Sequence, residues 1–289
     1  MKKWILGLVV LTYSISTLAC NIDGTGGFAP ENNLNISVSQ KSINGVDEDV
    51  FNEVIDEIVA IYEPIVIANG DRLTVNRKWK DGTVNASAQR TGKNVIVNMY
   101  GGLARHELVT KDGFAIVMCH EMGHHLGGAP KIGGWFGSKW ASNEGQSDYF
   151  ANLKCFRKVY GSEDNVAFIQ NLEVPAMVTE RCNEVFTNEA DSALCVRSAI
   201  AAKSTADLLS SLRGNGLTDF TNPDQSVVSK TNNRHPAAQC RLDTYFAASL
   251  CDIDMNIDVD NKDPNKGTCN RKDGDEVGLR SLCWYKPKN

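Results

Sequence analysis

The chain has 289 residues, of which 42% are hydrophobic and 22% charged, and its formal net charge is −5. This composition is typical of a globular protein with enough apolar material for a real core. Because the chain is acidic and has no basic stripe, nucleic acid is not expected among its partners.

The N-terminus predicts an export signal over residues 1–19. Two lysines precede the apolar stretch "WILGLVVLTYSISTLA", which ends in small residues and is too short for a comfortable membrane span. Cys20 then stands where a bacterial lipoprotein signal has its acylated cysteine, although the usual leucine is one step late at Leu18. We therefore expect an exported lipoprotein, anchored to the membrane through Cys20 at the periplasmic face of the outer membrane. A soluble periplasmic or secreted protein is the alternative.

The first half of the chain predicts a tether, a helix and a small sheet. Residues 20–40 are rich in Gly and Asn, which is typical of a flexible tether. Apolar residues recur at helical spacing over 51–62, and Pro64 is expected to close that helix. Short β-type runs around the turn at 81–82 and over 93–100 predict strands.

The second half predicts mainly helices. Residues 112–128 form a helical pattern ended by two glycines, and 129–142 follow as a loop. Helix returns over 143–160, two or three helices are expected over 163–213, and a last helix is expected to open at Pro236. The loop holds three large aromatic residues, which either form a lid over substrate or pin the loop to the core: Trp135, Phe136 and Trp140.

The cysteines favour an oxidising compartment. Nine are present, and eight remain when Cys20 is set aside, which is an even number. Their connectivity cannot be deduced from the sequence. Cys119 is expected to be a core thiol or a disulfide partner.

The strongest chemical signal is H-E-x-x-H, formed by His120, Glu121 and His124. Residues four apart on a helix lie about 40° apart on one face, so the two imidazoles can hold one zinc ion. Glu121 lies beside them and can reach a metal-bound water. A structural zinc site or coincidence is the alternative.

A catalytic zinc uses three protein ligands, and the segment "NEGQSD" supplies the third. Glu144 can bind the metal, which gives one Zn²⁺ per chain. Asp148 follows four residues later on the same helical face. Its carboxylate can accept a hydrogen bond from the far ring nitrogen of a ligating histidine and fix that ring's tautomer.

These motifs resemble those of a known class of enzymes. H-E-x-x-H followed by N-E-x-x-S-D resembles the gluzincin metallopeptidases, of which thermolysin is the familiar member. The segment "RHPAAQCRL", with His235 and Arg241, resembles the H-P-x-x-x-x-R segment of the peptidases related to HtpX, BepA and the CaaX prenyl-protease. This second resemblance covers residues 93–250. It departs from the family at Glu144, since the family usually has an E-x-E-A-D type of segment there.

The resemblance implies a fold and a mechanism. The fold class would be α+β and mostly α-helical, a zincin-like domain over 41–251 with its active-site helix beside a small sheet. After it, residues 252–289 are rich in Asp, Asn and Gly, and this composition predicts an irregular, Cys-containing tail. The enzyme would be a zinc-dependent endopeptidase of the bacterial envelope, in which Glu121 takes a proton from the zinc-bound water. His235 and Arg241 would stabilise the oxyanion.

The substrate is expected to be a protein or peptide, lying as an extended chain along the edge of the strand at 94–100. Two other functions stay open: a zinc-bound assembly or chaperone-like factor that hardly cleaves, and an amidase acting on cell-wall peptides. The two remaining histidines are not assigned to the site. His125 is expected to pack or face solvent, and His106 to lie in a loop.

Overall fold

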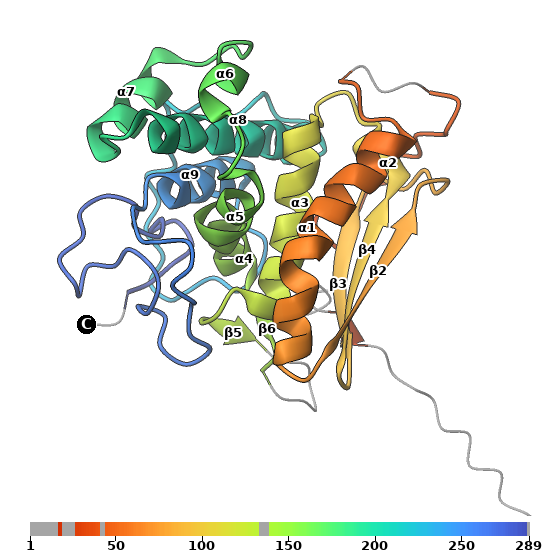
Figure 1. Cartoon of the computed structure of the whole chain (residues 1–289), viewed down its shortest axis with the longest axis horizontal. Coiled ribbons are helices and arrows are strands. Elements are labelled where there is room, and N and C mark those ends of the chain that lie inside the picture. Colours follow the sequence, from red (N-terminus) through yellow and green to blue (C-terminus); the bar gives the residue numbers. More distant parts are fainter. Residues whose placement is uncertain (1–16, 19–26, 41–43, 133–138, 288–289) are drawn as a thin grey trace, which may run out of the picture.

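The computed structural model describes residues 17–18, 27–40, 44–132 and 139–287. Its main sheet has the strand order β1-β3-β4-β2 (Figure 1). The strands are β1 (Thr17–Leu18), β2 (Arg72–Lys78), β3 (Ala86–Thr91) and β4 (Asn94–Tyr100). β2 runs parallel to β4, and the other pairs are antiparallel. The α+β class with a small sheet is confirmed.

The sheet order corrects the predicted position of the substrate. β4 lies between β2 and β3, so both of its edges already carry ladder hydrogen bonds. It cannot offer an edge to an extended peptide, as the sequence had suggested for residues 94–100. The sequence predicts which residues are strands, but the order of strands depends on tertiary packing.

Two long helices lie side by side against the sheet, α1 (Glu48–Ala68) and α3 (Lys111–Leu126) (Figure 1). Asp47 caps α1 by accepting a hydrogen bond from the Val50 N–H at 2.9 Å. The helix does not end at Pro64, as predicted, but continues to Ala68. Val66 is buried beyond the proline, and this packing keeps the last turn helical.

A continuous helix with a π-helical middle packs against α3. α4 (Glu144–Phe150), a π-helical segment (Ala151–Phe156) and α5 (Arg157–Tyr160) follow one another without a gap. Before α4, a short pair of strands, β5 (Lys131–Ile132) and β6 (Ala141–Ser142), stands where a loop was predicted over 129–142.

The remaining helices are a short one between β4 and α3 and four that lie on the other side of α3 and α4 from the sheet. They are α2 (Gly101–Ala104), α6 (Asn165–Ile169), α7 (Ala176–Val185), α8 (Glu189–Ser211) and α9 (Ala238–Ser249). Three of them fall within 163–213, as predicted. α9 begins two residues after Pro236, which lies just outside it.

The described part of the C-terminal segment, 252–287, forms no helix or strand, and Figure 1 shows it beside α9. It is packed into the domain. Trp284 is fully buried, and its ring lies where a Cβ on Gly145 would be, 2.2 Å from the nearest ring atom. A residue larger than glycine at the start of α4 would therefore displace this anchor.

The described part of the predicted tether, 27–40, begins with residues that are fixed in the core. Phe28 and Ala29 are fully buried, and the Phe28 N–H donates to the Ala86 carbonyl at 2.8 Å. Asn35 forms a β-bridge with Thr83. The Gly and Asn content predicts a loose chain and does not indicate the burial of Phe28.

Four disulfides join the eight cysteines other than Cys20: Cys119–Cys155, Cys182–Cys195, Cys240–Cys283 and Cys251–Cys269. Cys119 is thus a disulfide partner, and its bond ties α3 to the π-helical segment. The four bonds favour an oxidising, non-cytoplasmic compartment. Among the described residues, no helix has the length and apolar character needed to cross a bilayer. Cys20 and nearly all of the predicted export signal lie outside the described residues.

Candidate metal centre

Three of the predicted ligands meet at one point between α3 and α4. Ligand atoms of His120, His124 and Glu144 all lie within 4.8 Å of one another, and the three side chains are buried. Glu144 Oε2 is 3.3 Å from His120 Nε2, and its Oε1 is 3.6 Å from His124 Nε2. Two imidazoles and a carboxylate in this arrangement could hold a metal ion.

Local structure explains the convergence. His120 and His124 are one helical turn apart on α3. Asn143 caps α4 by accepting from the Gln146 N–H at 3.0 Å, which fixes the first turn that carries Glu144. A Cβ on Gly123 would lie 3.0 Å from the Ser147 backbone, so glycine at this position lets the two helices approach closely.

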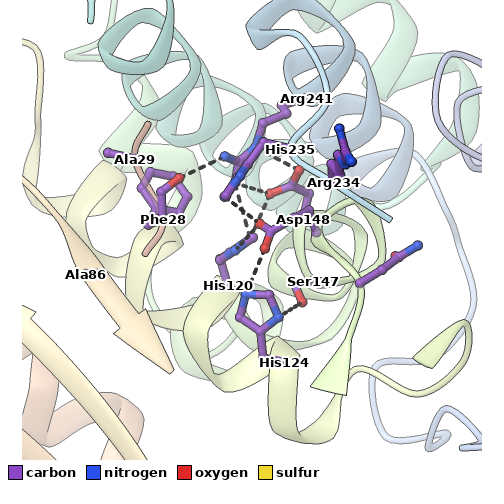
Figure 2. Close-up of polar contacts among 12 residues, drawn as sticks. Phe28, Ala29, Ala86, His120, His124, Ser147, Asp148, Arg234, His235 and Arg241 are labelled. Carbon is purple, nitrogen blue, oxygen red and sulfur yellow. Dashed lines mark hydrogen bonds and ion pairs between the residues drawn. The ribbon is translucent and has the colours of Figure 1, made fainter. Parts of the chain in front are cut away.

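A hydrogen bond at Nδ1, on the side of the ring away from the metal position, orients each histidine (Figure 2). His120 Nδ1 is 2.7 Å from Asp148 Oδ1, and His124 Nδ1 is 2.9 Å from the Ser142 carbonyl. Since a carboxylate and a carbonyl can only accept, both Nδ1 atoms are donors. In each neutral ring the lone pair of Nε2 is then directed to the centre, as a metal ligand requires.

Buried polar atoms that make no hydrogen bond are concentrated here. Among the described residues nine side-chain atoms are of this kind, and five belong to this centre: His120 Nε2, Glu121 Oε1 and Oε2, Glu144 Oε2 and His235 Nε2. Buried polar groups are normally satisfied, so such a group of donors and acceptors needs an explanation. A cation held by His120 Nε2 and Glu144 Oε2 would give these two atoms a partner, and the residues therefore fit a bound metal.

The carboxylates around His120 favour positive charge at the centre. Burial alone would lower the pKa of His120, but Asp148 and Glu144 raise it to about 9. Burial lowers the pKa of His124 to about 4, which keeps that ring neutral. The two carboxylates that stabilise a proton on His120 would equally stabilise a divalent cation at its Nε2.

Glu121 is adjacent to a ligand and fully buried. Burial raises its pKa to about 8, partly opposed by His120 and reinforced by Glu144. The side chain thus holds a proton more readily than an exposed glutamate does.

His235 enters the centre from the segment before α9. Its Nε2 lies 3.1 Å from Glu144 Oε2, although the two residues are 91 positions apart in the sequence (235 minus 144). The sequence placed His235 at the site only through a resemblance, and the structure brings it there.

Arg241 lies behind His120 rather than beside the ligand atoms (Figure 2). It is buried and donates from Nε to Asp148 Oδ2 at 2.9 Å, from Nη2 to Asp148 Oδ1 at 2.6 Å and from Nη1 to the Phe28 carbonyl at 3.2 Å. These contacts occupy the Nδ1 side of His120. We therefore correct its expected role: this position suits holding Asp148, not donating to an oxyanion.

Three residues that contact the site were not predicted from the sequence. Tyr245 donates its hydroxyl to Asp148 and stands four residues after Arg241, a helical spacing that could have indicated it. The Ser142 carbonyl and the Phe28 ring, whose centroid lies 5.0 Å from that of His120 in an edge-on contact, had no signal in the sequence.

The other aromatic and histidine positions lie outside this centre. Trp140 stacks on His125 with ring centroids 4.9 Å apart, which pins the base of the loop. His125 is buried, as one of its two expected placements. His106 follows α2, and its Nδ1 accepts from the Leu108 N–H at 3.2 Å. Trp135 and Phe136 lie outside the described residues.

Comparison of the chain with family models, with curated proteins and with solved structures found no match. The function is therefore argued from the centre itself.

Proposed function

We propose that the protein is a zinc-dependent endopeptidase of the gluzincin type, working in the bacterial envelope. One observation carries this proposal: two imidazoles and a carboxylate converge on one point, and the buried carboxylate of Glu121 interacts electrostatically with two of these ligands, His120 and Glu144. Structural zinc sites favour Cys ligands, and the described cysteines are engaged in disulfides. A His₂Glu set with a neighbouring free carboxylate suits hydrolysis better.

The chemistry divides among the residues by position. Bound zinc would supply a Lewis acid that polarises the scissile carbonyl and lowers the pKa of water toward about 7. Glu121 makes no hydrogen bond of its own, so it can take a proton from water and pass it to the leaving amine. His235 reaches the same centre and can donate to the developing oxyanion.

Asp148 and Arg241 do not contact the metal position but support the ligand His120. Asp148 holds the His120 ring by its Nδ1 atom, and Arg241 keeps Asp148 charged. Precise ligand orientation of this kind typically changes metal affinity or activity about 10- to 100-fold.

In the strand order β1-β3-β4-β2 the outer strands are β1 and β2, and β3 is open to an extended substrate only beyond the two residues that pair with β1. The chain itself already uses part of this edge, through β1, which lies within the predicted export signal, and through the Phe28 N–H. A peptide would have to pair with what remains or displace these contacts.

One observation favours the alternative, a zinc-bound assembly or chaperone-like factor with little catalysis. His120, Glu121 and His124 are 0% exposed, so a protein substrate cannot reach them in this conformation. Proteolysis requires the centre to open, whereas a binding factor does not.

The deciding experiment offers purified protein an unfolded, fluorescently labelled protein and, separately, cell-wall peptide fragments, each with and without a chelator. We expect cleavage of the unfolded protein by the wild type, loss of activity with chelator and recovery with zinc. Glu121→Gln should retain zinc and melt near the wild-type temperature but cleave about 10²–10⁴ times more slowly. Glu180→Gln, on an exposed position of α7, is the matched control.

Equal cleavage by Glu121→Gln and the wild type would show that the mechanism is wrong. Cleavage of cell-wall fragments alone would identify an amidase. If neither material is cleaved while the wild type and Glu121→Gln bind unfolded protein equally, the binding factor replaces the enzyme.

A further inference from the structure

A second chemical environment lies at the C-terminal end of α3, in a cavity of about 750 Å³. Its walls come from α1, the sheet, the β5–β6 pair, the π-helical segment and residues 255–262. None of the residues assigned to the metal centre lines it. The volume is that of a typical small-molecule site.

The lining is basic although the chain is acidic. It has two carboxylates, Asp71 and Asp258, and the first is paired with a cation: Asp71 Oδ2 lies 2.6 Å from Arg90 Nη2. The cationic side chains are six: Arg90, Lys131, Lys139, Lys154, Lys158 and Lys262. On a chain with a net charge of −5, such an excess of positive charge in one cavity indicates an anionic ligand.

Two of the lysines donate hydrogen bonds to backbone carbonyls in the wall of the cavity. Lys131 Nζ donates to the Trp140 carbonyl at 2.8 Å, and Lys154 Nζ to the Asp254 carbonyl at 2.7 Å. No carboxylate of the described residues lies within 4.0 Å of either ammonium group. Burial, together with neighbouring cations, lowers the pKa of each to about 8. Neither ammonium group thus has a direct ion-pair partner among the described residues, which an anion would supply.

The inner wall is apolar and carries two further polar atoms that make no hydrogen bond. Ile65, Val66 and Phe150 line the cavity. The Tyr62 hydroxyl and His125 Nδ1 are both buried among the lining residues and have no hydrogen-bond partner. These two groups are independent of the lysines and also indicate a missing polar ligand.

We propose that this cavity binds a phosphate ester whose body is apolar. The lysines would neutralise the phosphate, since charge-assisted hydrogen bonds to phosphate oxygens are among the strongest available to a side chain. The Tyr62 hydroxyl would donate to one of its oxygens, and Ile65 and Phe150 would cover the apolar body. Such a ligand can be free in solution or be the head group of a lipid, and both present the same chemistry.

Calorimetric titration of the purified full chain with octyl phosphate tests the proposal. We expect octyl phosphate to bind at least tenfold more tightly than octyl glucoside, which has the same alkyl chain and no charge. Inorganic phosphate, which lacks the alkyl chain, should bind more weakly than octyl phosphate. Binding is read directly, so the result does not depend on whether the metal centre cleaves peptides.

Substitutions assign the binding to the cavity. Lys131→Met and Lys154→Met should each weaken octyl phosphate binding at least tenfold, and the exposed Lys230→Met should leave it unchanged. Should the buried variants fail to fold, Lys158→Met and Lys262→Met alter the same lining at more accessible positions. Equal affinity for octyl phosphate and octyl glucoside, or affinity unchanged in all of the lining variants that fold, overturns the proposal.

Vesicles distinguish the two sources. Retention of the wild type on phosphatidylglycerol vesicles, reduced in Lys158→Met, assigns a lipid head group. Octyl phosphate binding without retention on these vesicles assigns a free phosphate ester. In this experiment the protein with Lys158 and the Lys158→Met variant both also carry Cys20→Ser, so that an acyl anchor retains neither of them.

Discussion

Arg241 holds Asp148 in a two-bond fork, with Nε donating to Oδ2 at 2.9 Å and Nη2 to Oδ1 at 2.6 Å. Both side chains are buried. Burial alone would raise the pKa of Asp148, but Arg241 and His120 lower it below its usual value. The carboxylate that orients His120 is therefore kept charged by a residue that does not reach the ligand atoms.

Removing this partner should destabilise the protein. Arg241→Met leaves a buried carboxylate without its cation, which typically costs about 3–5 kcal/mol in the free energy of unfolding. Arg241→Lys keeps the charge but loses the planar fork, so its loss should be smaller. Urea unfolding measures both, with the exposed Arg213→Met as the control. If Arg241→Met were as stable as Arg213→Met, Arg241 would not be the residue that holds Asp148.

Metal content should follow the three converging ligands. We expect one zinc per wild-type chain by elemental analysis and little in His124→Ala or Glu144→Gln, because a site with two ligands binds zinc far more weakly. His106→Ala, which removes a histidine elsewhere, should keep its zinc. Added zinc should raise the melting temperature of the wild type but not that of His124→Ala or Glu144→Gln. Equal zinc in the wild type and His124→Ala would place the metal elsewhere.

His235→Ala should separate catalysis from metal binding. Loss of one donor to an oxyanion typically lowers turnover about 10²–10³-fold. The variant retains His120, His124 and Glu144, so its zinc content should be unchanged. Turnover of labelled peptide and elemental analysis of the same sample check both parts. A variant that cleaves as fast as the wild type would remove His235 from the mechanism.

Octyl phosphate binding in the basic cavity should depend on pH with a defined sign. The pKa values of Lys131 and Lys154 are lowered to about 8, so both ammonium groups are charged below that pH and lose their protons above it. Affinity should be highest below pH 8 and fall about tenfold between pH 7 and pH 9.5. Titrations at several pH values measure this.

The neighbours of these lysines set the same direction. Arg90 faces Lys131, and Arg157 and Lys158 face Lys154, and all three cations favour loss of the proton. Asp254 and Asp258 oppose them at Lys154. Lys154→Met should flatten the pH profile, whereas Lys230→Met should reproduce that of the wild type. Affinity that rises with pH would exclude the two lysines as the groups that bind the phosphate.

The sequence predicted what local periodicity controls. Four-residue spacing placed His120 and His124 on one face, and the same spacing linked Glu144 to Asp148. It could not predict contacts set by tertiary packing alone. Phe28 reaches His120 across 92 residues (120 minus 28), and the internal position of β4 depends on how three strands assemble. The resemblance placed Arg241 at the site, but the side chain lies on the Nδ1 side of the His120 imidazole and not on the Nε2 side. A sequence motif indicates that a residue is near the site and does not indicate where its side chain points.

The burial of Phe28 beside His120 limits how far the centre can lie from an anchor. Eight residues separate Cys20 from Phe28 (28 minus 20), and an extended chain spans at most about 3.3–3.6 Å per residue. If Cys20 carries acyl chains, Phe28 stays within roughly 30 Å of the bilayer surface. The metal centre would then reach only substrates in the layer of the periplasm next to the membrane.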